Sequence, residues 1–234
     1  MMSAVFRFLS SSIIIFFLLS ASLSLSLSDA KSLRANGAFG SPDTVDSLDI
    51  SKYLGTWYQV ASNNLAIIST KQKDTYCSTA LYGANGDDTI SVHNYCTKSK
   101  PDGEAYTIDG YAYQTNKAEQ PGQLKVKFSG KDAPPFAAPY WILELGPINA
   151  NNLYDYSIVS DSTGSFLFVL VQDVPTYNAK YKDTISKTLD KLGFTGFKAP
   201  IETYHGSDCV YEANRRWAEM RADIESEEAQ NKKQ

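Results

Sequence analysis

The stretch Tyr53-Leu54-Gly55-Thr56-Trp57-Tyr58 begins a run of strand-type sequence that extends to residue 62. Its Thr, Trp and Tyr residues favour a pleated, half-buried extended chain. Gly55 lets another part of the backbone approach closely, because glycine has no side chain. Trp57 supplies a large apolar body that needs a buried place in the fold. The stretch therefore predicts the first strand of a β-protein.

Similar runs rich in Val, Ile, Thr, Tyr and Phe recur along the middle of the chain, separated by turn residues such as Asn85-Gly86-Asp87. They predict eight strands, near 54–62, 75–84, 88–97, 105–114, 122–129, 139–145, 154–161 and 165–173. Short links without intervening helices indicate an all-β, up-and-down antiparallel β-barrel, because closure removes exposed sheet edges. Eight strands enclose an interior just large enough for one small ligand, and Trp57 is expected to plug the closed end.

One amphipathic helix is predicted after the strands, over residues 178–193. Its apolar side chains recur at the spacing of one helical face, at Tyr181, Ile185, Leu189 and Leu192. Gly193 is a natural helix terminator. We expect this C-terminal helix to pack its apolar face on the outside of the barrel.

The order of these segments resembles the lipocalin family, most closely the apolipoprotein D-like lipocalins. Gly55-Thr56-Trp57 is similar to the Gly-X-Trp signature that opens the first lipocalin strand, and residues 49–52 precede it as the family's lead-in turn does. Three later segments match in order and spacing: Ala138–Leu143, Tyr154–Val159 and Phe166–Leu170. The resemblance covers about residues 47–211 and implies a carrier of a small hydrophobic ligand such as a fatty acid, sterol, retinoid or pigment.

The resemblance also implies ligand contacts. Asn94 ends the strand segment Ile90-Ser91-Val92-His93-Asn94 at a position that faces the cavity in this family, and Phe168 falls where a cavity tryptophan is found. Tyr140 and Trp141 are neighbours on one strand and must point to opposite faces, so only one of them can line the pocket.

The sequence departs from the family at the closed end of the barrel. Lipocalins usually cover the signature tryptophan with an arginine that follows the last strand, whereas the aligned residue here is Gln172. A glutamine can supply the hydrogen bonds of that arginine but not its charge on the indole face. We expect the fold to survive this change, with Gly55, Trp57 and Gln172 as its structural signature.

Three cysteines, Cys77, Cys96 and Cys209, leave one unpaired if two form a disulfide. The resemblance implies Cys77–Cys209, which ties a barrel strand to the C-terminal segment. Cys77–Cys96 is the alternative, because these residues lie symmetrically about the turn at Asn85-Gly86-Asp87. A slip of one residue in that hairpin would place them on opposite faces, so register decides between the two pairs.

The ends of the chain differ from the middle. Arg7, the apolar run from Ile13 to Leu19 and the small residues near Ala30 have the layout of a secretory signal peptide, for which a membrane anchor is the alternative. The expected organisation is a signal peptide at 1–30, a flexible lead-in at 31–46, the lipocalin domain at 47–211 and a charged tail at 212–234. We therefore expect a secreted, extracellular monomer that contacts a membrane or lipoprotein.

The sequence offers little support for catalysis or other partners. The net charge of −4 carries no basic patch for nucleic acid. The two histidines, His93 and His205, belong to no metal-binding pattern, and we expect no metal, cofactor or catalytic residue. Two rival functions remain. One is an enzyme on the same fold, an isomerase or carotenoid-acting enzyme that uses Cys96 as an inward-facing thiol; the other is a secreted interaction protein.

Overall fold

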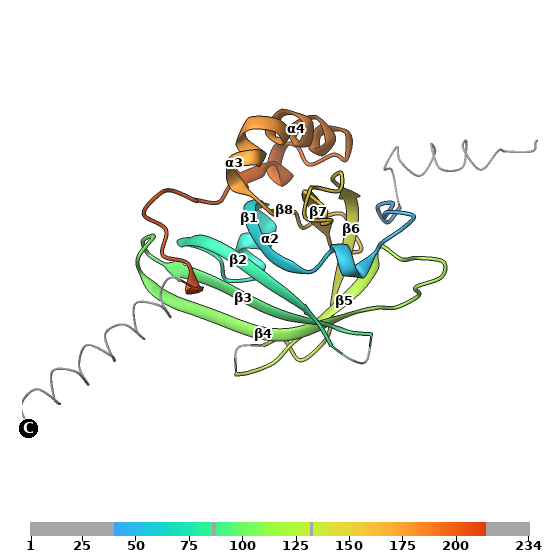
Figure 1. Ribbon diagram of the computed structural model, residues 1–234, viewed down its shortest axis with the longest axis horizontal. Helices are drawn as coiled ribbons and strands as arrows, with labels where there is room; N and C mark the ends of the chain where they lie inside the picture. The colour runs from blue at the N-terminus through green and yellow to red at the C-terminus, as the bar shows by residue number, and fades with distance from the viewer. Residues whose placement is uncertain (1–39, 86–87, 132, 214–234) are drawn as a thin grey trace, which may run out of the picture.

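The computed structural model describes residues 40–85, 88–131 and 133–213. Its eight main strands are β1 (Gly55–Asn63), β2 (Thr75–Ala84), β3 (Ile90–Lys98), β4 (Glu104–Gln114), β5 (Gln123–Phe128), β6 (Ala138–Leu145), β7 (Tyr156–Ser160) and β8 (Phe168–Val171). Each strand pairs antiparallel with the next, and β8 also pairs with β1, so the sheet closes into a barrel (Figure 1). The predicted all-β, eight-stranded up-and-down barrel is confirmed, with strand bounds within a few residues of those expected.

A helical segment follows β8 and packs on the outside of the barrel, as predicted. It consists of α3 (Val174–Thr176), a π-helical turn η2 (Tyr177–Tyr181) and α4 (Lys182–Lys191), and it lies above the strands in Figure 1. Ile185 and Leu189 of the predicted apolar stripe are buried in a cluster with outward-facing residues of β1, β7 and β8. We call this set the outer cluster.

The helical segment begins earlier than the expected residue 178. The side chain of Asp173 accepts a hydrogen bond from the backbone nitrogen of Thr176 at 2.8 Å, and Pro175 lies in the first turn. A short acidic cap followed by proline is a strong helix start. The helix therefore begins directly after β8.

The barrel is closed between β1 and β2 in two different ways. The two strands pair directly only where Gly55–Tyr58 faces Thr79–Tyr82. Beyond this point β1 is irregular between Gln59 and Ala61, and a short ninth strand, β9 (Pro200–Glu202), pairs with Ala61–Asn63. This ninth strand was not predicted from the sequence.

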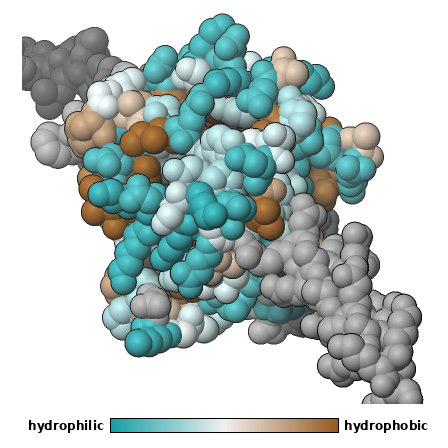
Figure 2. Space-filling model, turned by 90° about the vertical axis from the view of Figure 1, so that its left-hand side faces the viewer, coloured by the Kyte–Doolittle hydropathy of each residue, from teal (hydrophilic) through white to brown (hydrophobic). Residues whose placement is uncertain are grey.

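The residues that follow β9 bridge the rest of the gap. Thr203 donates its backbone N–H to the carbonyl of Val60 at 2.9 Å, and Cys77 of β2 donates to the carbonyl of Tyr204 at 3.0 Å. The chain from 200 to 213, which we call the C-terminal strap, thus forms hydrogen bonds to both strands. In Figure 1 it descends from the helical segment on the left of the barrel. The face turned toward this side is mostly hydrophilic, with separate hydrophobic patches (Figure 2).

The disulfide joins Cys77 to Cys209, and their Cα atoms lie 5.6 Å apart. This confirms the pair implied by the family resemblance. The pairing of β2 with β3 shifts between Tyr76 and Thr79, which leaves both Cys77 and Ser78 opposite Cys96. Cys77 adopts a left-handed backbone with φ 55°, and its side chain bonds to the strap, while Cys96 remains a buried free thiol.

The start of the domain covers one end of the barrel. A 3₁₀ turn, η1 (Ile50–Lys52), precedes β1, and Val45 donates its N–H to the carbonyl of Ile142 at 3.0 Å. Val45 also packs against the apolar interior, so this part of the lead-in expected to be flexible is in fact packed. The two remaining short elements are α2 (Asn64–Ser69) and η3 (Gly196–Lys198).

The signal peptide expected at 1–30 and most of the charged tail expected at 212–234 lie outside the described residues. Within the residues that the structure does describe, no helix combines the length and apolar character needed to cross a membrane.

Removal of the disulfide should weaken the closure of the barrel. The bond spans a sequence separation of 132 residues, so breaking it releases a long loop in the unfolded chain. We expect Cys209→Ser to lower the free energy of unfolding by about 2–5 kcal/mol, measured by urea denaturation. Cys96→Ala, which removes the free thiol, is the matched control. Equal loss of stability in both variants would contradict a structural role for the Cys77–Cys209 bond.

Candidate functional site

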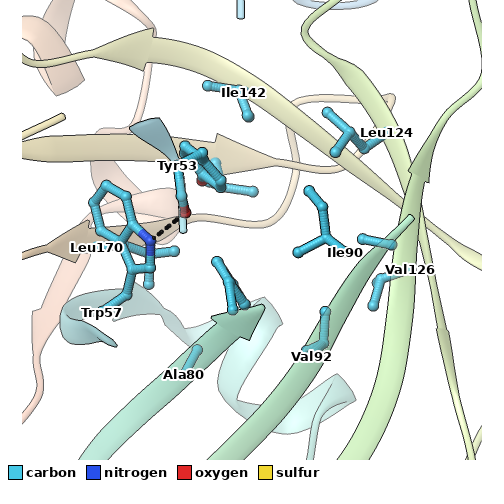
Figure 3. Close-up of a cluster of buried hydrophobic side chains, with 12 residues drawn as sticks. Tyr53, Trp57, Ala80, Ile90, Val92, Leu124, Val126, Ile142 and Leu170 are labelled. Carbon is cyan, nitrogen blue, oxygen red and sulfur yellow. Dashed lines mark hydrogen bonds between the residues drawn. The ribbon is translucent and has the colours of Figure 1, made fainter. Parts of the chain in front are cut away.

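The interior of the barrel contains a cavity of about 40 Å³. Apolar side chains of β3 and β5 form much of its wall, and Figure 3 shows Ile90, Val92, Leu124 and Val126 extending from their strands into the interior. Its volume is far below the roughly 300–1,000 Å³ of typical ligand pockets. A cavity this size takes only one end of a lipid-sized molecule unless side chains move.

Four hydroxyl groups form a hydrogen-bonded chain beside this cavity. The hydroxyl of Tyr82 lies 3.2 Å from that of Tyr140, which lies 2.8 Å from that of Tyr53, and the Tyr53 hydroxyl lies 2.9 Å from Oγ of Ser157. The three tyrosines line the cavity, whereas Ser157 is fully buried behind them. Sequence reasoning identified Tyr140 but missed the other three members, which lie far apart along the chain.

The three tyrosines that form this hydrogen-bonded row of hydroxyls are uncharged at neutral pH. Burial raises the pKa of Tyr82 to about 12, and it raises the pKa values of Tyr53 and Tyr140 further. Neutral hydroxyls can each donate one hydrogen bond. The four hydroxyls therefore offer four donor protons, whereas only three hydrogen bonds join them, so one proton is left for another acceptor.

Asn94 of β3 provides a second polar group at the cavity. Its Oδ1 atom is buried, and no protein group among the described residues donates a hydrogen bond to it. Asn94 lies opposite Ala80 in the sheet, and Tyr82 lies opposite Val92. The two side chains are therefore diagonal neighbours on the inner face of β2 and β3.

The structure separates the other residues expected at the site. Tyr140 lines the cavity, while its neighbour Trp141 packs against the outer cluster beneath the helical segment and does not reach the interior. The alternation of side chains along β6 explains this division. Phe168, at the start of β8, packs against the interior apolar cluster but is not part of the cavity wall.

The three signature residues meet at the closed end. Trp57 is fully buried and donates its indole N–H to the carbonyl of Tyr53 at 2.9 Å (Figure 3). Gln172 donates from Nε2 to the carbonyl of Leu54 at 3.4 Å. Gly55 has φ +95°, and a Cβ there would make only ordinary contacts. Backbone conformation, and not the close approach expected from the sequence, is therefore the reason for glycine at this position.

Two histidines anchor the C-terminal strap. His93 of β3 lies between Asp109 and Glu212, with nitrogen-to-oxygen distances of 2.5 and 2.7 Å. Burial alone would lower the pKa of His93, but the two carboxylates outweigh it and raise this pKa. His205 lies within 2.9 Å of both the Tyr211 hydroxyl and the Gln59 carbonyl, and burial lowers its pKa.

The described residues contain no group of three or more His, Cys, Asp or Glu side chains placed to hold a metal ion. The site is thus an enclosed apolar interior with a few polar atoms inside an up-and-down β-barrel, the arrangement of a ligand-binding barrel protein.

The sequence matches the family model described as a lipocalin-like domain over residues 48–199. The chain belongs to the lipocalin family, as the Gly-X-Trp segment and strand order implied.

Curated relatives support the same assignment. The chain is 27% identical to temperature-induced lipocalin-1 of Arabidopsis thaliana, over 64% of this chain and 76% of that protein. It is 32% identical to rat (Rattus norvegicus) apolipoprotein D, over 59% of this chain and 64% of that protein. It is 31% identical to the outer membrane lipoprotein Blc of Vibrio cholerae, over 70% of this chain and 88% of that protein.

Solved structures share the fold at lower identity. Insecticyanin from the tobacco hornworm Manduca sexta superposes with a TM-score of 0.53 at 18% identity, covering 75% of this chain and 91% of that one. Lobster apocrustacyanin A1 gives a TM-score of 0.51 at 20% identity, covering 76% and 98%.

Protonation of His205 should loosen the strap. The pKa of His205 is lowered in the folded protein, so neutral His205 contributes to the stability of the fold near neutral pH. This contribution is lost as the pH falls below 6.5, the ordinary pKa of histidine. His205→Gln should therefore reduce the fall in Tm between about pH 7.5 and pH 5, measured by differential scanning calorimetry.

His93→Gln is the control, because the raised pKa of His93 stabilises the fold below pH 6.5 and this stabilisation is lost as the pH rises. This variant should make the fall in Tm toward acid pH steeper. If both variants changed the pH profile in the same direction, the assigned environments would be wrong.

Proposed function

We propose that this lipocalin binds a small hydrophobic molecule that ends in a hydroxyl group, and carries it in the barrel without reacting with it. The observation that carries the proposal is the apolar cavity with two polar features on one wall. One is the Oδ1 of Asn94, which has no hydrogen-bond partner among the described residues, and the other is the tyrosine hydroxyl chain. A ligand hydroxyl both donates and accepts hydrogen bonds, so it complements both features.

The direction of the hydroxyl chain supports this ligand class. Ser157 at the buried end has Tyr53 as the hydrogen-bond partner of its hydroxyl. If Ser157 donates to Tyr53, Tyr53 to Tyr140 and Tyr140 to Tyr82, the proton of Tyr82 is left to point into the cavity. A ligand oxygen could then accept from Tyr82 while its proton is donated to Asn94.

The charge of the lining favours an uncharged ligand. None of the described residues that line the cavity is a lysine, arginine or histidine. Burial of an ionised carboxylate without a cationic partner is costly. Among the hydrophobic ligands expected from the sequence, sterols and retinoids with a hydroxyl group therefore fit better than fatty acids.

The volume of the cavity favours entry of the polar end first. With about 40 Å³ available, the hydroxyl end fits near Asn94 and the hydrocarbon part extends toward the opposite end of the barrel, past Phe128. Binding of a whole sterol or retinoid requires rearrangement of interior side chains. Because fixing the rearranged side chains costs free energy, we expect micromolar affinity, a binding free energy of about −8 kcal/mol.

Cys96 argues for a carrier over the rival enzyme. Burial raises its pKa to about 11, so the thiol is protonated at neutral pH and is a poor nucleophile. Cys96 is also absent from the cavity lining. Recovery of the bound ligand unchanged after incubation would be consistent with transport without catalysis. We further propose that the protein is secreted, since the Cys77–Cys209 disulfide suits an oxidising compartment, and that it acts as a monomer.

Retinol and retinoic acid provide a matched pair of probes, because they share their hydrocarbon and differ in hydroxyl against carboxyl. Titrations followed by tryptophan fluorescence should show saturable binding of retinol, at least about tenfold tighter than retinoic acid at neutral pH. Asn94→Leu should weaken the binding of retinol by several-fold to about tenfold, because one hydrogen bond to the ligand is lost. The control is Ser78→Ala, which removes a buried hydroxyl outside the cavity lining.

Two outcomes would contradict the proposal at different levels. Tighter binding of retinoic acid would overturn the hydroxyl preference and leave the carrier function standing. The absence of a saturable response to retinol, retinoic acid, cholesterol and a fatty acid would count against the carrier function itself.

We also propose that the protein contacts lipid through one end of the barrel, the end at which strands β1 and β5 terminate. Three large apolar side chains are exposed there: Ile68 in α2 (65%), Phe136 in the β5–β6 loop (65%) and Phe197 in η3 (77%). The carbonyl of Lys198, next to Phe197, accepts a hydrogen bond from Asn63 at the end of β1. Strands β1 and β5 run in the same direction in this up-and-down barrel, so the β5–β6 loop that carries Phe136 follows the same end of the barrel as α2 and η3.

Replacement of these three side chains by serine should abolish co-flotation of the protein with phosphatidylcholine vesicles. Leu81→Ser, which changes an exposed leucine in the barrel wall, is the control and should leave flotation unchanged. Flotation that survives the triple replacement, or that is absent in the unchanged protein, would refute lipid contact through this end. Neither result bears on binding of retinol in the interior.

A further inference from the structure

A second cavity, of about 330 Å³, lies outside the barrel between the helical segment and the C-terminal strap. This volume falls within the range of about 300–1,000 Å³ that is usual for small-molecule sites. The interior cavity, by comparison, measures about 40 Å³. The larger of the two spaces is therefore on the outer surface, in a position that the carrier function does not use.

The floor of this outer cavity is apolar. It is formed by Val60 of β1 together with Val174 and Tyr177 of the helical segment, all of which belong to or pack against the outer cluster. Val60 and Tyr177 are only 4% and 8% exposed. A ligand that enters the cavity therefore buries apolar surface against a packed base.

The opposite wall is formed by residues 203–206 of the strap, and several contacts hold it in place. Thr203 and Tyr204 form backbone hydrogen bonds to β1 and β2, at 2.9 and 3.0 Å. His205 lies 2.9 Å from the carbonyl of Gln59. The Cys77–Cys209 disulfide fixes the strap a few residues further on. The wall is thus largely preformed, which lowers the ordering cost of binding.

The charges at the cavity cancel. Lys182 at the start of α4 and Glu202 of β9 form an ion pair at 2.5 Å, and both side chains are substantially exposed. Burial raises the pKa of Tyr177 and lowers the pKa of His205, so both are neutral near pH 7. A net-neutral lining provides no unbalanced charge to attract an anion or a cation.

Three of the ten residues that line the outer cavity are aromatic. Tyr177 comes from the helical segment, and Tyr204 and His205 come from the strap. The rings of Tyr204 and His205 also pack against those of Tyr76 and Tyr211, with ring centroids 5.8 and 6.0 Å apart. Aromatic residues on two sides of a cavity favour a flat aromatic guest, and the hydroxyl and backbone groups beside them can bind polar atoms at its edge. We propose that this outer cavity is a second ligand site, which takes a small, uncharged aromatic molecule with a hydrogen-bonding edge, of the indole or phenol type.

The test uses 5-fluoroindole as the probe. Its ¹⁹F NMR signal should shift saturably as the protein is added, and the largest amide chemical-shift changes should fall at 177–182 and 202–206. Asn178→Trp should weaken binding at least about tenfold, because the exposed Asn178 side chain lines the cavity and an indole would occupy part of its space. Ala179→Trp is the matched control, an exposed neighbour outside the lining.

Competition distinguishes this site from the interior. Saturating retinol and the Asn94→Leu variant should leave 5-fluoroindole binding unchanged. Displacement by retinol, equal effects of the two tryptophan variants, or no saturable ¹⁹F shift would each overturn the proposal. Benzoate and 4-fluorobenzylamine serve as charged probes, and tighter binding of either would overturn the preference for an uncharged guest.

Discussion

The closure of the barrel between β1 and β2 is the constraint on which the rest of the structure depends. Direct pairing covers only one half of β1, and the C-terminal strap completes the seam by hydrogen bonding to both strands. Without that closure, the eight strands would present two open edges and the apolar interior would be open to water. The Cys77–Cys209 disulfide and the His93 and His205 contacts all act on this seam.

The same seam explains why two cavities coexist. Irregular pairing in β1 and β2 admits the strap into the wall, and the strap continues beside the helical segment, where the outer cavity forms. Inside the barrel, Trp57 packs against Tyr53, and the chain of tyrosine hydroxyls borders the small interior cavity. The interior cavity is therefore narrow, whereas the larger outer cavity lies between β1, the helical segment and the strap.

The sequence by itself determined the fold. Strand-type runs, turn residues and one helical stripe are local signals, because side-chain alternation and backbone preference depend on near neighbours. They predicted all eight strands and the outer position of Ile185 and Leu189. The Gly55-Thr56-Trp57 segment placed the first strand and the family, and the family resemblance implied Cys77–Cys209 as the disulfide.

Only the tertiary structure decided contacts between distant segments. The residues Tyr53, Tyr82, Tyr140 and Ser157 are joined by barrel closure, and no local pattern marks them as one network. Whether Tyr140 or Trp141 faces inward depends on the register of β6, since a shift of one residue exchanges the faces. The same holds for Cys77, which the β2 irregularity releases from its place opposite Cys96. Register and long-range pairing are properties of the closed sheet, so the sequence alone left them open.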